Sequence, residues 1–112
     1  VPVLVEEGYH KRGIPIETLA ATTSRNVAEL YSLPNKGRIQ PGYDADFAIV
    51  DPAGSTTVDP ADYPSHSDYS PFEGRIFRGA VTHTVLRGTL TVDAGKAVSL
   101  DTAPGHYLKR PS

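Results

Sequence analysis

The chain has 112 residues and a formal net charge of -2, and because it carries no dense run of Lys or Arg, the sequence disfavours nucleic-acid binding. It contains no cysteine, which excludes disulfides, thiolate zinc sites and cysteine nucleophiles. No apolar run could span a bilayer and no secretory signal opens the chain, so we expect a cytoplasmic protein without membrane contact.

The first predicted element is a helix from Val3 to about Arg12. It should end at Gly13, because glycine accepts the left-handed conformation that closes many helices. Apolar residues share one face of this helix, so we expect that face to pack against other polypeptide. The sequence also lacks methionine, and we expect the chain to begin inside a longer protein. The apolar face comprises Val1, Leu4, Val5 and Tyr9.

A second helix is predicted from Ile16 to Tyr31. Its apolar residues recur at helical spacing and form one stripe, which is typical of a helix packed on a core. Leu33 precedes Pro34 and is therefore pushed out of helical geometry, which ends the helix. The stripe consists of Ile16, Leu19, Ala20, Val27, Ala28 and Leu30.

A turn and a short strand follow the helices. Pro41-Gly42 has the sequence of a type II turn. The run Phe47–Val50 is continuously apolar and too short for a helix, so it predicts a strand covered on both faces. Asp44 and Asp46 could form an acid–base pair, but we expect them to accept backbone N–H bonds at the strand entry. Their side chains are expected to point in opposite directions.

The segment from Asp51 to about Gly79 is predicted to be a long loop, because it is polar and interrupted by prolines. Phe72 and Phe77 are its expected anchors. The next two strands are rich in Thr and Val and are joined at Arg87-Gly88 by a tight hairpin turn. A second turn precedes a short final strand. The predicted strands are Ala80 to Leu86, Thr89 to Val92, and about Ala97 to Leu100.

Helices therefore precede strands, which predicts an α+β fold of two helices and a small, mostly antiparallel sheet. So few short strands rarely complete a sandwich, and an unpaired strand edge tends to pair with other polypeptide. We therefore expect the sheet to be completed by polypeptide from elsewhere.

The sequence assigns no residue to catalysis, cofactor binding or metal binding. Its four histidines lack the His-x-His and His-x-x-x-His spacings that mark a metal pair. Ser and Asp near His66 are better explained by hydrogen bonds to nearby backbone than by a triad, because triads join separated segments. The histidines are His10, His66, His83 and His106, and the residues clustered near His66 are Ser65, Ser67, Asp68 and Ser70.

Four segments carry a family resemblance. With Asn35–Pro52, Ser67–Gly74, Thr84–Gly88 and Gly105–Arg110, the chain resembles the C-terminal end of the cyclic amidohydrolases. That group contains dihydroorotases, hydantoinases, dihydropyrimidinases and allantoinases. Val27 departs from the family pattern, which usually has proline there. The subfamily stays open, since Asp68-Tyr-Ser is similar to hydantoinases, Ser70–Gly74 to dihydroorotases and Leu86–Gly88 to allantoinases.

The resemblance implies that residues 1–34 correspond to the last helices around a TIM barrel. Residues 35–112 would form the C-terminal part of a composite β-sandwich, with a loop at about 51–79 and a C-terminal tail. Members of the family bind two divalent metals, usually zinc, through residues of the barrel. None of those positions occurs in this sequence, so the chain alone should lack an active site and be inactive.

Three functions remain open at this stage. The chain could be the C-terminal portion of a hydrolase of cyclic amides, with the missing N-terminal barrel polypeptide as its partner. It could instead be a non-catalytic module that binds a partner or forms a homo-oligomer with other copies of itself through exposed strand edges. A small independent hydrolase built on Ser70 or His66 is the least favoured.

Overall fold

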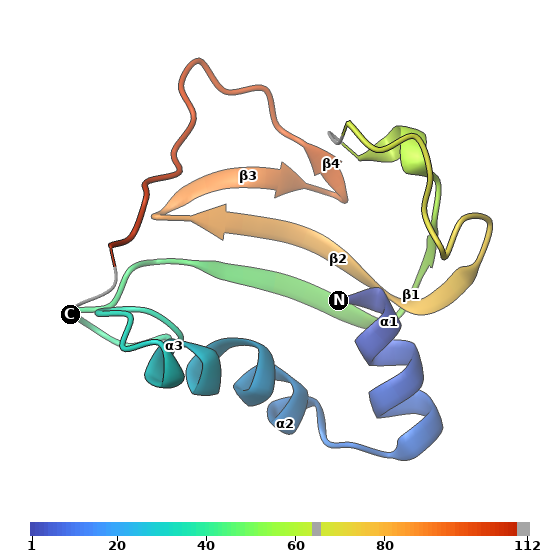
Figure 1. Cartoon of the computed structure of the whole chain (residues 1–112), viewed down its shortest axis with the longest axis horizontal. Coiled ribbons are helices and arrows are strands. Elements are labelled where there is room, and N and C mark those ends of the chain that lie inside the picture. Colours follow the sequence, from blue (N-terminus) through green and yellow to red (C-terminus); the bar gives the residue numbers. More distant parts are fainter. Residues whose placement is uncertain (64–65, 110–112) are drawn as a thin grey trace.

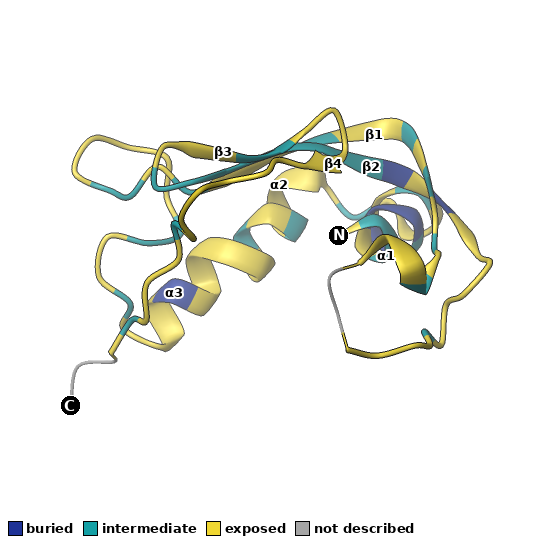
Figure 2. Ribbon diagram, turned by 90° about the horizontal axis from the view of Figure 1, so that it is seen from above, coloured by how far each residue is buried: buried dark blue, intermediate teal, exposed yellow. Residues whose placement is uncertain are grey.

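The structure, a computed structural model, describes residues 1–63 and 66–109. Figure 1 shows the strands as one curved sheet, with the helices arranged along one part of it. In the perpendicular view of Figure 2, the helices, the central loop and the C-terminal tail all lie on the same side of the sheet. The opposite face of the sheet is bare of other described segments.

The N-terminal helix forms as predicted. A short α-helical turn, α1 (Pro2–Leu4), continues into the π-helical segment η1 (Val5–His10). Gly13 has a φ of 64° just after the helix, as its C-terminal position requires. Val5 is the one buried residue of the predicted apolar face, and it is 2% exposed. The remainder of that face, Val1, Leu4 and Tyr9, is exposed.

The second predicted helix is also confirmed. It runs through α2, η2 and α3 without a break in the chain. Ala28 is buried, whereas Leu30 is 77% exposed. The apolar stripe is therefore only partly covered by the described residues. The bounds are α2 Ile16–Ala20, η2 Ala21–Arg25 and α3 Asn26–Leu30.

The strands form a four-stranded antiparallel sheet in the order β1-β2-β3-β4. Arg87 and Gly88 both have positive φ, 51° and 80°, which is the signature of the predicted tight hairpin between β2 and β3. The last strand is shorter than predicted. The strands are β1 Phe47–Thr57, β2 Ile76–Leu86, β3 Thr89–Asp93 and β4 Lys96–Ala97.

The predicted loop from Asp51 to Gly79 is wrong in extent. Strand β1 continues to Thr57 and strand β2 starts at Ile76, so the connection spans only 58–75 and includes the short helix η3 (Pro60–Asp62). Pro52 does not end the strand. The register shifts between Asp51 and Ser55, so the residues between them, Pro52 included, are not paired with β2.

The core is small and centres on Phe77, which is 1% exposed. The Phe72 ring meets it edge-on at 5.8 Å, and the Arg75 guanidinium lies 4.8 Å from the centre of the Phe77 ring. Phe72 thus anchors the loop against Phe77, which lies in β2 and not in the loop as predicted. Helix and sheet approach closely at Gly79, where a Cβ atom would lie 2.7 Å from the Cβ of Val5.

Candidate functional site

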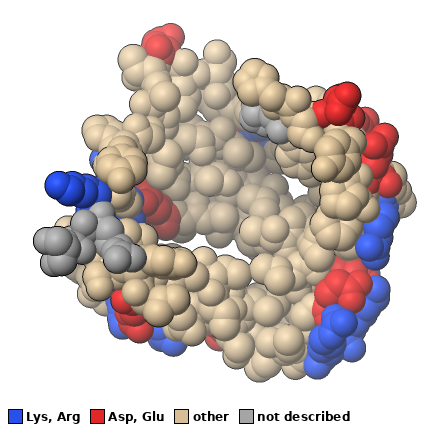
Figure 3. All heavy atoms as spheres, viewed as in Figure 1, with Lys and Arg blue, Asp and Glu red and all other residues tan. Residues whose placement is uncertain are grey.

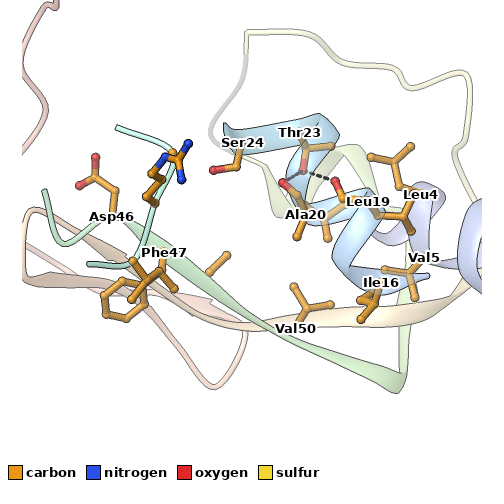
Figure 4. Close-up of a pocket in the computed structure, with 15 residues that line it drawn as sticks. Leu4, Val5, Ile16, Leu19, Ala20, Thr23, Ser24, Asp46, Phe47 and Val50 are labelled. Atoms are coloured by element: carbon orange, nitrogen blue, oxygen red, sulfur yellow. Dashed lines mark hydrogen bonds between the residues drawn. The ribbon is translucent and has the colours of Figure 1, made fainter. Parts of the chain in front are cut away.

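The described residues form a cleft between the helices and strand β1, with a volume of about 350 Å³, which we call the helix–β1 cleft. It exists because the apolar stripe of the helices faces the apolar start of β1 without filling the space between them. In Figure 4, Ile16 from α2 and Val50 from β1 lie on opposite walls. Leu4, Leu19, Phe47 and Ile39 complete most of the apolar lining.

Three of the polar side chains that line this cleft, those of Thr23, Arg38 and Asp46, bind other protein groups. Thr23 donates its hydroxyl hydrogen to the Leu19 carbonyl at 2.8 Å, within its own helix. Arg38 pairs with Glu29 at 2.5 Å, and Asp46 binds groups described below. Because substrate pockets normally present convergent polar groups, this cleft is better suited to an apolar occupant.

The charge distribution agrees with an apolar hollow. Figure 3 shows a hollowed face whose floor and walls are mostly residues other than Lys, Arg, Asp and Glu. Most charged side chains lie around its outside, whereas Arg38 and Asp46 line the cleft itself. Large exposed apolar surfaces rimmed by charge commonly mark places where other polypeptide binds.

A polar cluster of Lys36, Asp44 and Asp46, here called the Lys36 cluster, lies beside the cleft. The Lys36 Nζ atom is 2.7 Å from Asp44 Oδ2 and also contacts Asp46 Oδ2. The expectation that the two aspartates point in opposite directions was wrong, because a tight turn, closed by the Asp46 N–H and the Asp44 carbonyl at 2.8 Å, brings them together. Both carboxylates therefore bind one cation.

The Lys36 cluster connects distant parts of the chain. Asp46 Oδ1 accepts the Arg87 backbone N–H at 2.7 Å, and Gly88 donates its N–H to the Ala45 carbonyl at 3.0 Å. The β2–β3 hairpin turn is thereby fixed to the start of β1. The predicted role of Asp46 as an acceptor of backbone N–H at the strand entry is confirmed.

The pKa values of the cluster reflect this pairing. Burial alone would raise the pKa of Asp46, but the hydrogen bonds from Lys36 and from the Arg87 amide outweigh it and lower that pKa. For Lys36, burial works in the opposite direction, yet the bonds to both aspartates raise its pKa. Lys36 and Asp46 thus form an ion pair, and Asp46 is not poised as a general acid.

A second ion pair joins the N-terminal helix to the sheet. Glu6 Oε2 accepts hydrogen bonds from the Arg78 backbone N–H at 2.9 Å and from Arg78 Nε at 3.0 Å. The hydrogen bonds from the side chain and then from the backbone of Arg78 lower the pKa of Glu6 to about 2. The pair fixes the orientation of the helix that forms one wall of the cleft.

The histidines and the serine cluster are not brought together. His10 Nε2 lies 2.7 Å from the Pro52 carbonyl oxygen, and His83 Nε2 lies 3.2 Å from Asp93 Oδ1. Ser70 Oγ accepts the Phe72 N–H at 3.2 Å, a local backbone interaction of the expected kind. His66 and His106 are exposed, and His106 lines a second cleft that also includes Lys36 and Asp46. Ser65 falls outside the described residues.

The side chains do not fit a two-metal site. Among residues 1–63 and 66–109, no group of three or more His, Asp or Glu side chains is arranged to hold a metal ion. In the same residues, no helix combines the length and apolarity that crossing a membrane requires.

Residues 9–92 match the family described as the Amidohydrolase family. The chain belongs to this family. As a cyclic amidohydrolase sequence, it is 44% identical over 111 residues to an allantoinase of Rubrobacter xylanophilus, a match that covers 99% of the chain and 24% of that enzyme. An allantoinase of Deinococcus radiodurans is 41% identical over 97% of the chain and 23% of the enzyme.

Solved amidohydrolase structures share the fold of this chain. An L-hydantoinase from Arthrobacter aurescens superimposes with a TM-score of 0.80 at 33% identity, over 88% of this chain and 22% of that one. A D-hydantoinase gives a TM-score of 0.83 at 28% identity, over 97% of this chain and 24% of that one. This amidohydrolase chain therefore spans about a quarter of the length of its relatives. Its helices and sheet correspond to part of the TIM-barrel amidohydrolase fold.

Sequence reasoning missed the two ion-paired tethers. Glu6 and Arg78 are 72 positions apart, so no local pattern indicates their contact. Lys36 lies close to Asp44 and Asp46 in sequence, but the tight turn between the two aspartates has no clear local signal.

Proposed function

We propose that this chain is the C-terminal portion of a metal-dependent hydrolase that opens the C–N bond of a cyclic amide, with allantoin the favoured substrate. The observation that carries the proposal is the match to the Rubrobacter allantoinase, which covers almost the whole chain at 44% identity but only 24% of that enzyme. The chain supplies helices at the side of the barrel and part of a composite sandwich.

The catalytic groups lie, on this proposal, in the barrel polypeptide that is the partner of this chain. Two divalent metal ions bound there would activate water and polarise the amide carbonyl. The residues of this chain form apolar walls and ion-paired tethers, and they do not form a metal-binding set in its described part. Its contribution is to support the catalytic part, and the chain alone should be inactive.

A chimera tests this proposal directly. The chain replaces the matching 111-residue segment of the Rubrobacter allantoinase, and allantoin hydrolysis is measured with zinc present. The chimera should hydrolyse allantoin, whereas the same enzyme without the segment and this chain alone should not. A chain that turns over allantoin by itself, at a rate proportional to its concentration, would contradict the proposal.

A non-catalytic role in self-association is the second candidate. It is favoured by β1, whose outer edge has no partner strand within the described residues. Sedimentation of the isolated chain over a range of concentrations tests it. A homo-oligomer that persists at low concentration supports self-association, and a monomer at high concentration argues against it.

A further inference from the structure

Ile39 is the most conspicuous feature of the cleft that the proposed function does not explain. It lines the helix–β1 cleft at its rim and is 85% exposed. A single exposed isoleucine needs no explanation, but this one adjoins a hollow in which Leu4, Ile16 and Phe47 are also exposed.

The loop that carries Ile39 is held in place at both ends. Asp44 donates its N–H to the Asn35 carbonyl at 2.9 Å, which closes the base of the loop, and Lys36 binds both aspartates. At Gly37, with a φ of 81°, a Cβ atom would lie 2.8 Å from the Cβ of Ala28, so the loop is tightly packed on the helix. Ile39 is therefore presented by a preorganised loop.

Preorganised apolar groups bind with a smaller loss of conformational entropy than mobile ones do. A knob beside a hollow is the geometry of packed polypeptide, in which side chains of one segment enter spaces of another. The cleft lacks the convergent polar groups that a small polar ligand would need. These features favour an apolar stretch of protein as the occupant.

From these observations we infer that the helix–β1 cleft is the seat of one uncharged, apolar segment of the polypeptide that lies outside this chain in the full-length enzyme, with Ile39 packed against it. This inference rests on the proposed function. Its support is the length of the missing polypeptide, since the chain accounts for only 24% of the Rubrobacter enzyme. A second copy or a small apolar ligand would be a different occupant.

The absence of cysteine from the chain provides a clean test, because any introduced cysteine is the only thiol of this segment. Ile39→Cys and Ala20→Cys place a thiol at the rim and on the wall of the cleft. Ile76→Cys is the matched control, since Ile76 is 69% exposed and is not part of the cleft lining. Each variant is made in the allantoinase chimera and labelled with a thiol reagent, and peptide mass spectrometry gives the rate at each site.

The expected result is that the thiols at positions 39 and 20 react at least about tenfold more slowly in the folded chimera than in urea, while the thiol at position 76 does not. Equal rates at all three sites, or equal protection at position 76, would overturn the inference. Protection at position 39 that disappears on dilution would identify a second copy as the occupant and overturn it as well. Protection at position 20 without protection at position 39 would point to a small ligand and would also overturn it.

Allantoin hydrolysis by the same chimera separates the two proposals. An active chimera with a freely reactive thiol at position 39 rejects the docking inference and leaves the proposed function standing. An inactive chimera with a protected thiol at position 39 rejects the proposed function and leaves the docking inference standing. A chimera that fails to fold gives the urea rates everywhere and counts against both.

Discussion

Gly79 shows how a single residue determines the contact between helix and sheet. Its φ of 112° is a conformation that residues with a side chain rarely adopt, and Val5 occupies the space that a Cβ would need. Val5 is almost fully buried at this contact. The close approach of the N-terminal helix to β2 therefore depends on the absence of a side chain at position 79.

Replacing this glycine should be costly. Gly79→Ala is expected to lower the free energy of unfolding by about 2 kcal/mol or more, because backbone strain and overlap with Val5 act together. Gly42→Ala is the matched control, since Gly42 also has a positive φ but nothing lies within 4 Å of the place that a Cβ would take. It should cost about 1 kcal/mol. Urea denaturation of both variants in the chimera measures the difference, and equal losses would contradict the steric argument.

At the scale of elements, two ion-paired tethers hold the secondary structure together. Glu6 and Arg78 join the N-terminal helix to β2, and the Lys36 cluster joins the start of β1 to the β2–β3 turn. Each tether includes a backbone N–H as well as a charged side chain. Both therefore fix geometry more strongly than an exposed ion pair would.

The Glu6–Arg78 tether predicts a pH dependence. The folded-state pKa of Glu6 is about 2, below its ordinary value of 4.5, so its contribution is complete above pH 4.5 and is lost as pH falls toward 2. Glu6→Gln should unfold more readily than the wild type at pH 7, and the difference between the two should shrink across this window. Thermal denaturation at several pH values checks it, and a difference that does not change with pH would refute the linkage.

The two aspartates of the Lys36 cluster should differ in importance. Asp46→Ala leaves the Arg87 N–H without its acceptor and is expected to cost about 1–2 kcal/mol. Asp44→Ala leaves Lys36 paired with Asp46 and should cost less than about 1 kcal/mol. Chemical denaturation compares them. A larger loss for the Asp44 variant would show that the contact with the hairpin turn is not the important one.

Elements with a local signal could be predicted from the sequence. Gly13 ends the first helix and Arg87-Gly88 forms the hairpin, because both depend on the conformation of one or two residues. The extension of β1 past Pro52 could not be predicted, since pairing resumes only when β2 lies alongside. The sequence predicts the apolar residues that line the cleft but not its shape. That shape depends on how the ion-paired tethers hold the helices against the sheet.

At the scale of the whole molecule, the described residues bury little. Val5, Ala28 and Phe77 are their buried hydrophobic residues, and one face of the sheet is bare. Stability in a small domain comes mainly from apolar burial, which here is limited. On the proposal that the chain is part of a longer enzyme, other polypeptide would complete this core.

The segment should therefore be much more stable inside a full-length enzyme than alone. Backbone amides of β2 are expected to exchange with deuterium at least about 100-fold more slowly in the allantoinase chimera than in the isolated chain. Mass spectrometry of peptides from β2 measures both rates. Exchange that is equally slow in the isolated chain would show that the described residues form a complete core.

The Glu6–Arg78 tether also affects the order of folding during synthesis. Glu6 leaves the ribosome long before its partner, since 72 positions separate them. The N-terminal helix cannot dock on β2 until that strand has been translated, and contacts so distant in sequence slow the search for the native state. The N-terminal helix is thus translated before β2 but reaches its final place only after that strand has been made.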